Sequence, residues 1–190
     1  MIKKCVDTIT DWLIGCEIVE ETDKDLYSYA LYSVLLTISP LLWAVGFGIC
    51  MGCIGRSVTI IIPFVMIRKF SGGYHAKYSW LCLIESSLLL LLCIVLSFQI
   101  KLGWSLTFIT VGAAVSLVCC SPIDNENREL DQEEYVHCKR MVAVLVFIFL
   151  LMALMLFGGR QYIYSVCTSI GVILSAGLQF PCIFKKFGKR

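Results

Sequence analysis

Residues 141–159 read MVAVLVFIFLLMALMLFGG, an apolar run without a charged side chain. A run of this length can cross the hydrocarbon core of a bilayer, roughly 30 Å thick, as one α-helix. Five more uncharged windows occur in the chain, at 31–55, 57–67, 86–100, 102–123 and 161–184. Across all 190 residues 58% are hydrophobic and the mean hydropathy is +0.83, too high for a water-soluble domain. The sequence therefore predicts an all-α, polytopic integral membrane protein with four to six transmembrane helices.

The window at 57–67 is too short to span a bilayer by itself, since its eleven residues rise only about 16 Å as a helix. Either Arg56 snorkels to the surface or the segment is shortened. Pro40, Pro63 and several glycines nearby suggest a bent or re-entrant hairpin for this part of the chain. Both interpretations return the chain to the face from which it came.

Basic residues concentrate in alternate connections between the apolar windows. Thirteen of the sixteen Lys and Arg residues fall in four connections: 1–30, 68–80, 121–140 and 183–190. The remaining connections hold only Arg56, Lys101 and Arg160. Because basic residues are retained on the cytoplasmic side of a membrane, we expect a multi-pass protein of the cell membrane with both termini in the cytoplasm.

The N-terminal segment, 1–25, is predicted to be a cytoplasmic amphipathic helix. Its apolar residues recur three or four positions apart: Ile2, Val6, Ile9, Leu13 and Cys16. Such a helix can lie along the inner membrane surface or pack on its own bundle. Seven acidic residues within the first thirty argue against a signal peptide. We expect residues 26–184 to form a single membrane-embedded domain and 185–190 a basic cytoplasmic tail.

Eleven cysteines would be unusual for a chain of this length unless they formed disulfides. Most of them fall in predicted spans or on the cytoplasmic side, where thiols stay reduced, so we expect packing roles instead. Cys50 and Cys53 have metal-site spacing but lack a second ligand pair. With two histidines in the chain and no phosphate-binding loop, neither a metal nor another cofactor is expected, and no nucleic-acid partner either.

A polar, glycine-containing island, RKFSGGYHAKYSWLC at 68–82, interrupts the apolar chain. The thiol of Cys82 needs a partner to ionise at neutral pH, and His75 is the nearest candidate base. On a straight helix the seven positions between them correspond to about 10.5 Å along the axis, too far for a hydrogen bond. Gly72 and Gly73 allow a sharp turn, so that His75 can fold back toward Cys82 near the N-terminus of the next helix. The island is therefore a predicted Cys/His catalytic site.

Together these features resemble the AgrB (accessory gene regulator protein B) family of integral-membrane cysteine endopeptidases. The matching residues of the island are Arg68, Gly72, Gly73, His75 and Cys82. A looser match lies in the cytoplasmic loop 121–140, at Pro122, Asp124, Asn127, Leu130 and Glu133.

The resemblance implies that His75 and Cys82 are catalytic and that the substrate is an AgrD-like precursor peptide. Such an enzyme removes the C-terminal tail of the precursor through a Cys thioester and allows cyclisation to a thiolactone or lactone. The product is a quorum-sensing signal. The resemblance also suggests a homodimer in the lipid bilayer.

Several neighbouring residues are secondary candidates. Glu85 is the only acidic residue of the spanning region, and it could orient His75 or pair with Arg68 or Lys69. Gly72 and Gly73 support catalysis through the turn. The candidate substrate-binding residues are basic: Arg68, Lys77, Lys139 and Arg140. His137 and Cys138 are adjacent in sequence, and adjacent residues of a helix do not face each other, so this second His/Cys pair is not a predicted dyad.

A different class of function is the alternative. A small membrane transporter or channel subunit could use His75 and Glu85 as a polar gating or ion site. Two features argue against this alternative: the island is built around a thiol at the membrane edge, and the chain shows no internal repeat of the kind found in transporters.

Overall fold

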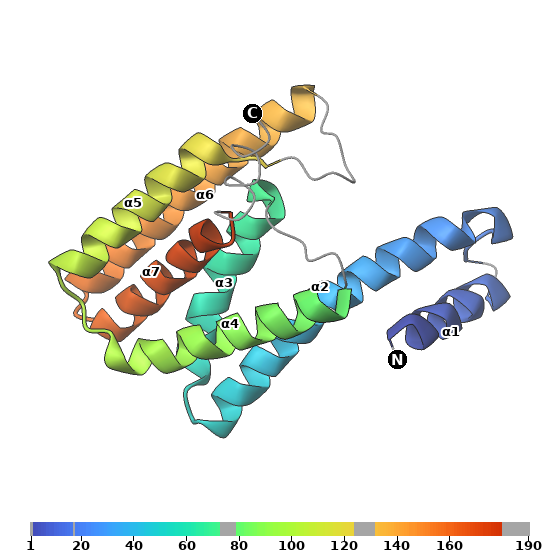
Figure 1. Cartoon of the computed structure of the whole chain (residues 1–190), viewed down its shortest axis with the longest axis horizontal. Coiled ribbons are helices and arrows are strands. Elements are labelled where there is room, and N and C mark those ends of the chain that lie inside the picture. The colour runs from blue at the N-terminus through green and yellow to red at the C-terminus, as the bar shows by residue number, and fades with distance from the viewer. Residues whose placement is uncertain (1, 17, 73–78, 124–131, 180–190) are drawn as a thin grey trace.

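A computed structural model describes residues 2–16, 18–72, 79–123 and 132–179. Within these ranges all regular elements are helices, which confirms the all-α prediction (Figure 1). The elements are α1 (Ile2–Gly15), the 3₁₀ turn η1 (Glu21–Asp23), α2 (Lys24–Cys50), α3 (Ile54–Ser71), α4 (Ser79–Gln99), α5 (Trp104–Cys120), α6 (Gln132–Gly158) and α7 (Tyr162–Gly177). From α2 onward, successive helices reverse direction (Figure 1).

Two helical stretches of the described chain are long and apolar enough to cross a membrane, Glu21–Cys50 and Gln132–Gly158. Only 19% and 22% of their apolar windows are buried inside the protein, whereas the core helix of a soluble protein would be mostly buried. Three shorter apolar helical stretches are Ile84–Gln99, Trp104–Cys120 and Tyr162–Gly177. The number of spans stays a prediction, because length and composition alone identify these candidates.

Helix α7 is the central element and packs against α3, α4, α5 and α6. Small side chains occupy much of its buried surface, including Ser165, Ser169, Gly171 and Ala176. A Cβ atom built on Gly171 would lie 2.6 Å from the carbonyl oxygen of Ile60 in α3. Small residues therefore allow α3 and α7 to approach closely, as in helix pairs of membrane proteins.

The buried side chains form two clusters around α7. One cluster joins α2, α3, α4, α5 and α7, and it contains Ile60, Phe64, Leu90, Ile94, Leu106 and Ile170. The other joins α3, α5, α6 and α7, and it contains Ile67, Leu117, Val142, Phe149 and Val172. These clusters hold the ends of α3, α5 and α7 in place relative to one another.

The window 57–67, which is too short to span a bilayer by itself, lies in the middle of a continuous helix. Helix α3 has 18 residues and keeps its helical backbone through Pro63, just as α2 does through Pro40. At helical rise α3 measures about 27 Å, close to the thickness of a hydrocarbon core. The described chain at 54–67 is therefore not an irregular re-entrant segment. The turn Met51–Cys53 joins α2 to α3, and Gly52 adopts a φ of 65° in it.

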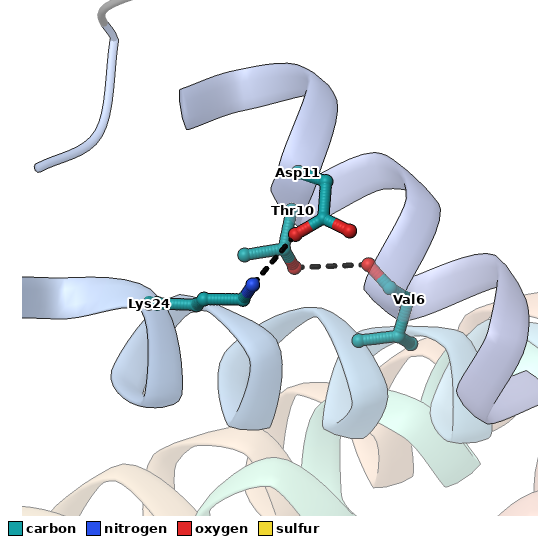
Figure 2. Close-up of polar contacts among 4 residues, drawn as sticks. All are labelled: Val6, Thr10, Asp11 and Lys24. Carbon is teal, nitrogen blue, oxygen red and sulfur yellow. Dashed lines mark hydrogen bonds and ion pairs between the residues drawn. The ribbon is translucent and has the colours of Figure 1, made fainter. Parts of the chain in front are cut away.

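Helix α1 lies within the predicted N-terminal segment 1–25 but ends at Gly15, and its buried face agrees only in part with the predicted apolar positions. It lies alongside the N-terminal half of α2, apart from the other helices (Figure 1). Val6 and Thr10 are buried, whereas Ile9 and Cys16 are exposed. Figure 2 shows Lys24 of α2 reaching Asp11, with 2.7 Å between Nζ and the carboxylate, while Thr10 donates a hydrogen bond to the Val6 carbonyl.

Candidate active site at the loop end of the bundle

Three helices finish at the same end of the molecule, which we call the loop end. Helix α3 ends at Ser71, α5 at Cys120 and α7 at Gly177. The island 68–82 and the loop 121–140 both begin here. The opposite end, which we call the turn end, carries the short connections 51–53, 100–103 and 159–161.

Gly72 ends α3 with a backbone conformation that only glycine adopts readily, φ 68° and ψ −157°. It forms an isolated parallel β-bridge with Ile123, which follows the end of α5. The Ile123 N–H donates to the carbonyl oxygen of Ser71 at 3.1 Å. A Cβ on Gly72 would lie only 2.6 Å from the Ile123 carbonyl oxygen, so the bridge leaves no room for a side chain. The predicted turn at Gly72 is confirmed.

Gln179 connects the end of α7 to the same place. Its side chain is fully buried, and Nε2 donates to the Ser121 hydroxyl at 2.7 Å and to the Ser71 carbonyl at 3.4 Å. Oε1 of Gln179 is buried without a hydrogen-bond partner among the described residues. We call these five residues the loop-end junction: Ser71, Gly72, Ser121, Ile123 and Gln179.

Gln179 is not among the residues predicted for the site. One signal was available, because Gln179 is a lone amide inside the apolar window 161–184, away from its ends. Polar groups in such windows usually have a structural or functional partner. The partners of Gln179 lie 58 and 108 positions earlier in the chain, so no local pattern reveals them.

The predicted catalytic residues are described only in part. His75, Gly73 and Lys77 lie outside the described residues. The backbone of Cys82 lies in the first turn of α4, which confirms the predicted position near a helix N-terminus. The approach of His75 to Cys82 stays a prediction.

Glu85 lies one turn further along α4 and is exposed. It forms no ion pair within the part of the chain that the structure describes, so a pairing with Lys69 is absent there. Arg68 lies in the last turn of α3, where a basic side chain interacts favourably with the helix dipole. Its guanidinium carbon is 5.8 Å from the centre of the Phe64 ring.

Lys139 and Arg140 are exposed on α6, about two turns from its start. Two acidic residues, Glu133 and Glu134, precede them in the first turn, where negative charge is favourable. His137 is also exposed on α6. The basic tail 185–190 lies outside the described residues.

The turn end contains a cavity of about 520 Å³ lined by Arg56, Phe98 and Tyr164, among others. Arg56 Nη1 donates to the Ser97 carbonyl at 3.2 Å, and the guanidinium lies 4.0 Å from the Phe98 ring centre. Glu85 does not line this cavity. The structure therefore gives no support to Glu85 as part of an ion pathway through it.

The nine cysteines that the structure describes are all free thiols. Cys53 is buried and Cys50 exposed, and no metal-binding group of three His, Cys, Asp or Glu residues exists among the described positions. Cys50 is the last residue of α2 and Cys53 directly precedes α3, so their spacing corresponds to the turn between the two helices.

Comparison with known proteins identifies the family. No curated protein and no solved structure matches the chain. The family model described as accessory gene regulator B, AgrB, matches residues 3–181, nearly the whole sequence. This range includes the island, the loop 121–140 and the loop-end junction. The chain therefore belongs to the AgrB family.

Proposed function

We propose that this chain is a membrane cysteine endopeptidase that removes the C-terminal tail of a quorum-sensing peptide precursor and allows the remainder to cyclise. His75 takes the proton of the Cys82 thiol, and the sulfur attacks a peptide carbonyl carbon. The C–N bond breaks, the leaving tail receives the proton as a free amine, and the peptide stays on Cys82 as a thioester. A Cys or Ser side chain of the peptide then attacks the thioester carbonyl, and the Cys82 sulfur leaves and regains a proton.

Family membership supports the biological setting of this proposal. AgrB proteins are membrane-associated and act in the accessory gene regulator system, where they are associated with processing of AgrD. The substrate is accordingly an AgrD-type precursor at a coarse level. The cysteine mechanism, the multi-pass topology and a homodimer belong to our proposal.

One observation carries the proposal for the site. The turn that precedes His75 is constrained by Gly72 and its bridge to Ile123, and the backbone of Cys82 lies in the first turn of the following helix. A helix N-terminus favours a thiolate, because the N-terminal end of the helix dipole is positive. A Cys/His pair in this segment requires two elements: a fixed turn before the base, His75, and a helix N-terminus at the nucleophile, Cys82.

The reaction needs no nucleotide. Exchange of one thioester for another is nearly neutral in free energy, whereas converting an amide to a thioester is unfavourable. Release or degradation of the tail must therefore draw the first step forward. A lactone product would be favoured further, because an oxygen ester is more stable than a thioester.

Intact-protein mass spectrometry of the enzyme tests the chemistry. Incubation with a precursor whose internal nucleophile is replaced by Ala should leave a hydroxylamine-labile peptide adduct on Cys82, because the second step is blocked. Neither Cys82→Ala nor His75→Ala should form the adduct or release the tail. Ser175→Ala, which alters only a buried hydroxyl that bonds within α7, is the matched control and should behave as wild type. Ring formation by Cys82→Ala would contradict the proposal. Retention of function by Cys82→Ser would also contradict it, because a transporter would tolerate that substitution.

A further inference from the structure

Gln179 is an amide in a position where an apolar side chain would be expected. It is fully buried beyond the end of α7, next to a core cluster that includes Val172 and Ala176. Its two donor contacts are used, but its acceptor oxygen has no partner among the described residues. A buried polar atom without a partner disfavours folding, so the contribution of Gln179 to stability is partly offset.

Among the described residues, both side-chain hydrogen bonds of Gln179 go to chain ends that begin the two loops. Ser71 is the last residue of α3, and Ser121 is the first residue after α5. Nε2 of Gln179 donates to the Ser71 carbonyl and to the Ser121 hydroxyl, and the Ile123 N–H also donates to the Ser71 carbonyl. The amide therefore fixes where the chain leaves α3 relative to where it leaves α5.

We propose that Gln179 is a positioning residue for the Cys/His site. Only Gly73 and Tyr74 separate Gly72 from His75 in sequence, so the orientation of the Ser71–Gly72 backbone determines where the base starts. The amide of Gln179 sets that orientation by bridging Ser71 and Ser121. This inference rests on the proposed function, because it assigns Gln179 a role through His75.

Misplacement of a catalytic group by about 1 Å can cost roughly a hundredfold in rate. Loss of the amide should therefore affect the chemical step more than binding of the peptide. It should also weaken the influence of His75 on the Cys82 thiol, so that alkylation of Cys82 requires a higher pH. Neither change follows from a merely structural role, which would alter stability and activity together.

The principal variant is Gln179→Met, which keeps the length and volume of the side chain but removes its hydrogen bonds. Three properties are measured on the full-length protein in detergent or nanodiscs: the melting temperature, kcat and KM for tail release, and the pH dependence of Cys82 alkylation. Alkylation is followed on the peptide that contains Cys82 by mass spectrometry, so the other cysteines do not interfere. Ser175→Ala is again the control, since its buried hydroxyl bonds only to the Gly171 carbonyl.

We expect Gln179→Met to change the melting temperature little, because the loss of two hydrogen bonds is offset by removal of the unpaired buried oxygen. It should lower kcat by about tenfold or more with little change in KM, and move the alkylation midpoint to higher pH. Ser121→Ala, which removes one of the two acceptors, should change kcat and the midpoint in the same direction by a smaller amount. If Gln179→Met is poorly folded, the measurements on Ser121→Ala decide whether the Gln179 amide positions the site. A loss of activity in both variants that only parallels their loss of stability would overturn the inference.

The same measurements separate this inference from the proposed function. If the wild-type midpoint is ordinary and His75→Ala does not change it, the Cys/His mechanism is wrong. If the wild-type midpoint is low and depends on His75, but Gln179→Met reproduces the wild-type midpoint and kcat, the mechanism stands and only the role of Gln179 is wrong.

Discussion

Gly72 satisfies two separate requirements that exclude every other residue type. Its backbone angles lie in a region that is essentially restricted to glycine, and its α-carbon approaches the Ile123 carbonyl too closely for a Cβ. The first requirement comes from the way α3 ends, and the second comes from a segment 51 positions further along the chain. A single glycine thus joins a local turn to a long-range contact.

Gly72→Ala should therefore lower the free energy of unfolding by about 2 to 4 kcal/mol, from backbone strain and the clash with Ile123. Tail release should fall more steeply than stability, because the turn leads to His75. Denaturant unfolding in micelles and a cleavage assay give the two values. Gly112→Ala in α5 is the control, since a Cβ there meets nothing within 4 Å and should be neutral or slightly stabilising. Equal stability of Gly72→Ala and wild type would show that the bridge is dispensable.

At the scale of one helix, α6 carries charges of opposite sign in sequence order. Glu133 and Glu134 occupy its first turn, and Lys139 and Arg140 follow before the long apolar run begins. The helix dipole explains the acidic pair, but it does not require the basic pair. We propose that Lys139 and Arg140 attract the acidic tail of the precursor.

The double variant Lys139→Gln/Arg140→Gln should weaken binding of a fluorescent precursor by about three- to tenfold, the range expected for two exposed charge contacts. The difference from wild type should shrink as salt is raised, because the Debye length at physiological ionic strength is about 8 Å. Lys101→Gln/Arg160→Gln removes the same charge at the turn end and should leave binding unchanged. Equal losses in the two double variants would mean that net charge, and not this position, attracts the peptide.

Over the whole molecule, charge is divided between the two ends. Among the described residues, the acidic side chains and most of the basic ones lie in the N-terminal region or near the loop-end termini of α3, α4 and α6. The turn end holds Arg56, in the first turn of α3, and Lys101 and Arg160, in its connections. The reversal of direction at each successive helix groups these segments in this way. We propose that the loop end faces the cytoplasm, as the distribution of basic residues favours.

Cysteine labelling on intact cells tests this orientation. Lys101→Cys at the turn end should react with a membrane-impermeant maleimide above the background of the native thiols. Ser79→Cys, at the start of α4, should react only after the cells are permeabilised. Labelling of Ser79→Cys from outside would place the island on the wrong side of the membrane for a cytoplasmic precursor.

The sequence alone determined the elements of this protein, because the signals for a helix are local. Uncharged windows, the three- and four-residue spacing of apolar side chains and glycine-containing turns were enough to predict the all-α class, the N-terminal helix, the turn at Gly72 and the place of Cys82 near a helix start. Helix ends were less accurate. Helix α3 extends beyond the window 57–67 at both ends, to Ile54 and Ser71, because Arg56, Arg68 and Lys69 continue a helix as readily as apolar residues do. The window 161–184 was shortened in the described chain, where α7 ends at Gly177.

Only the tertiary structure decided which face of each helix is used and what meets at the loop end. Helix α1 packs against α2 with Val6 and Thr10 buried, so the apolar periodicity of the segment identified the contact at Val6 but not at Thr10. The loop-end junction brings together Ser71, Ser121 and Gln179 over separations of 58 and 108 positions. Hydrogen bonds between such distant residues depend on how α3, α5 and α7 pack, and packing is a property of the assembled helices. A local pattern in the sequence carries no record of it.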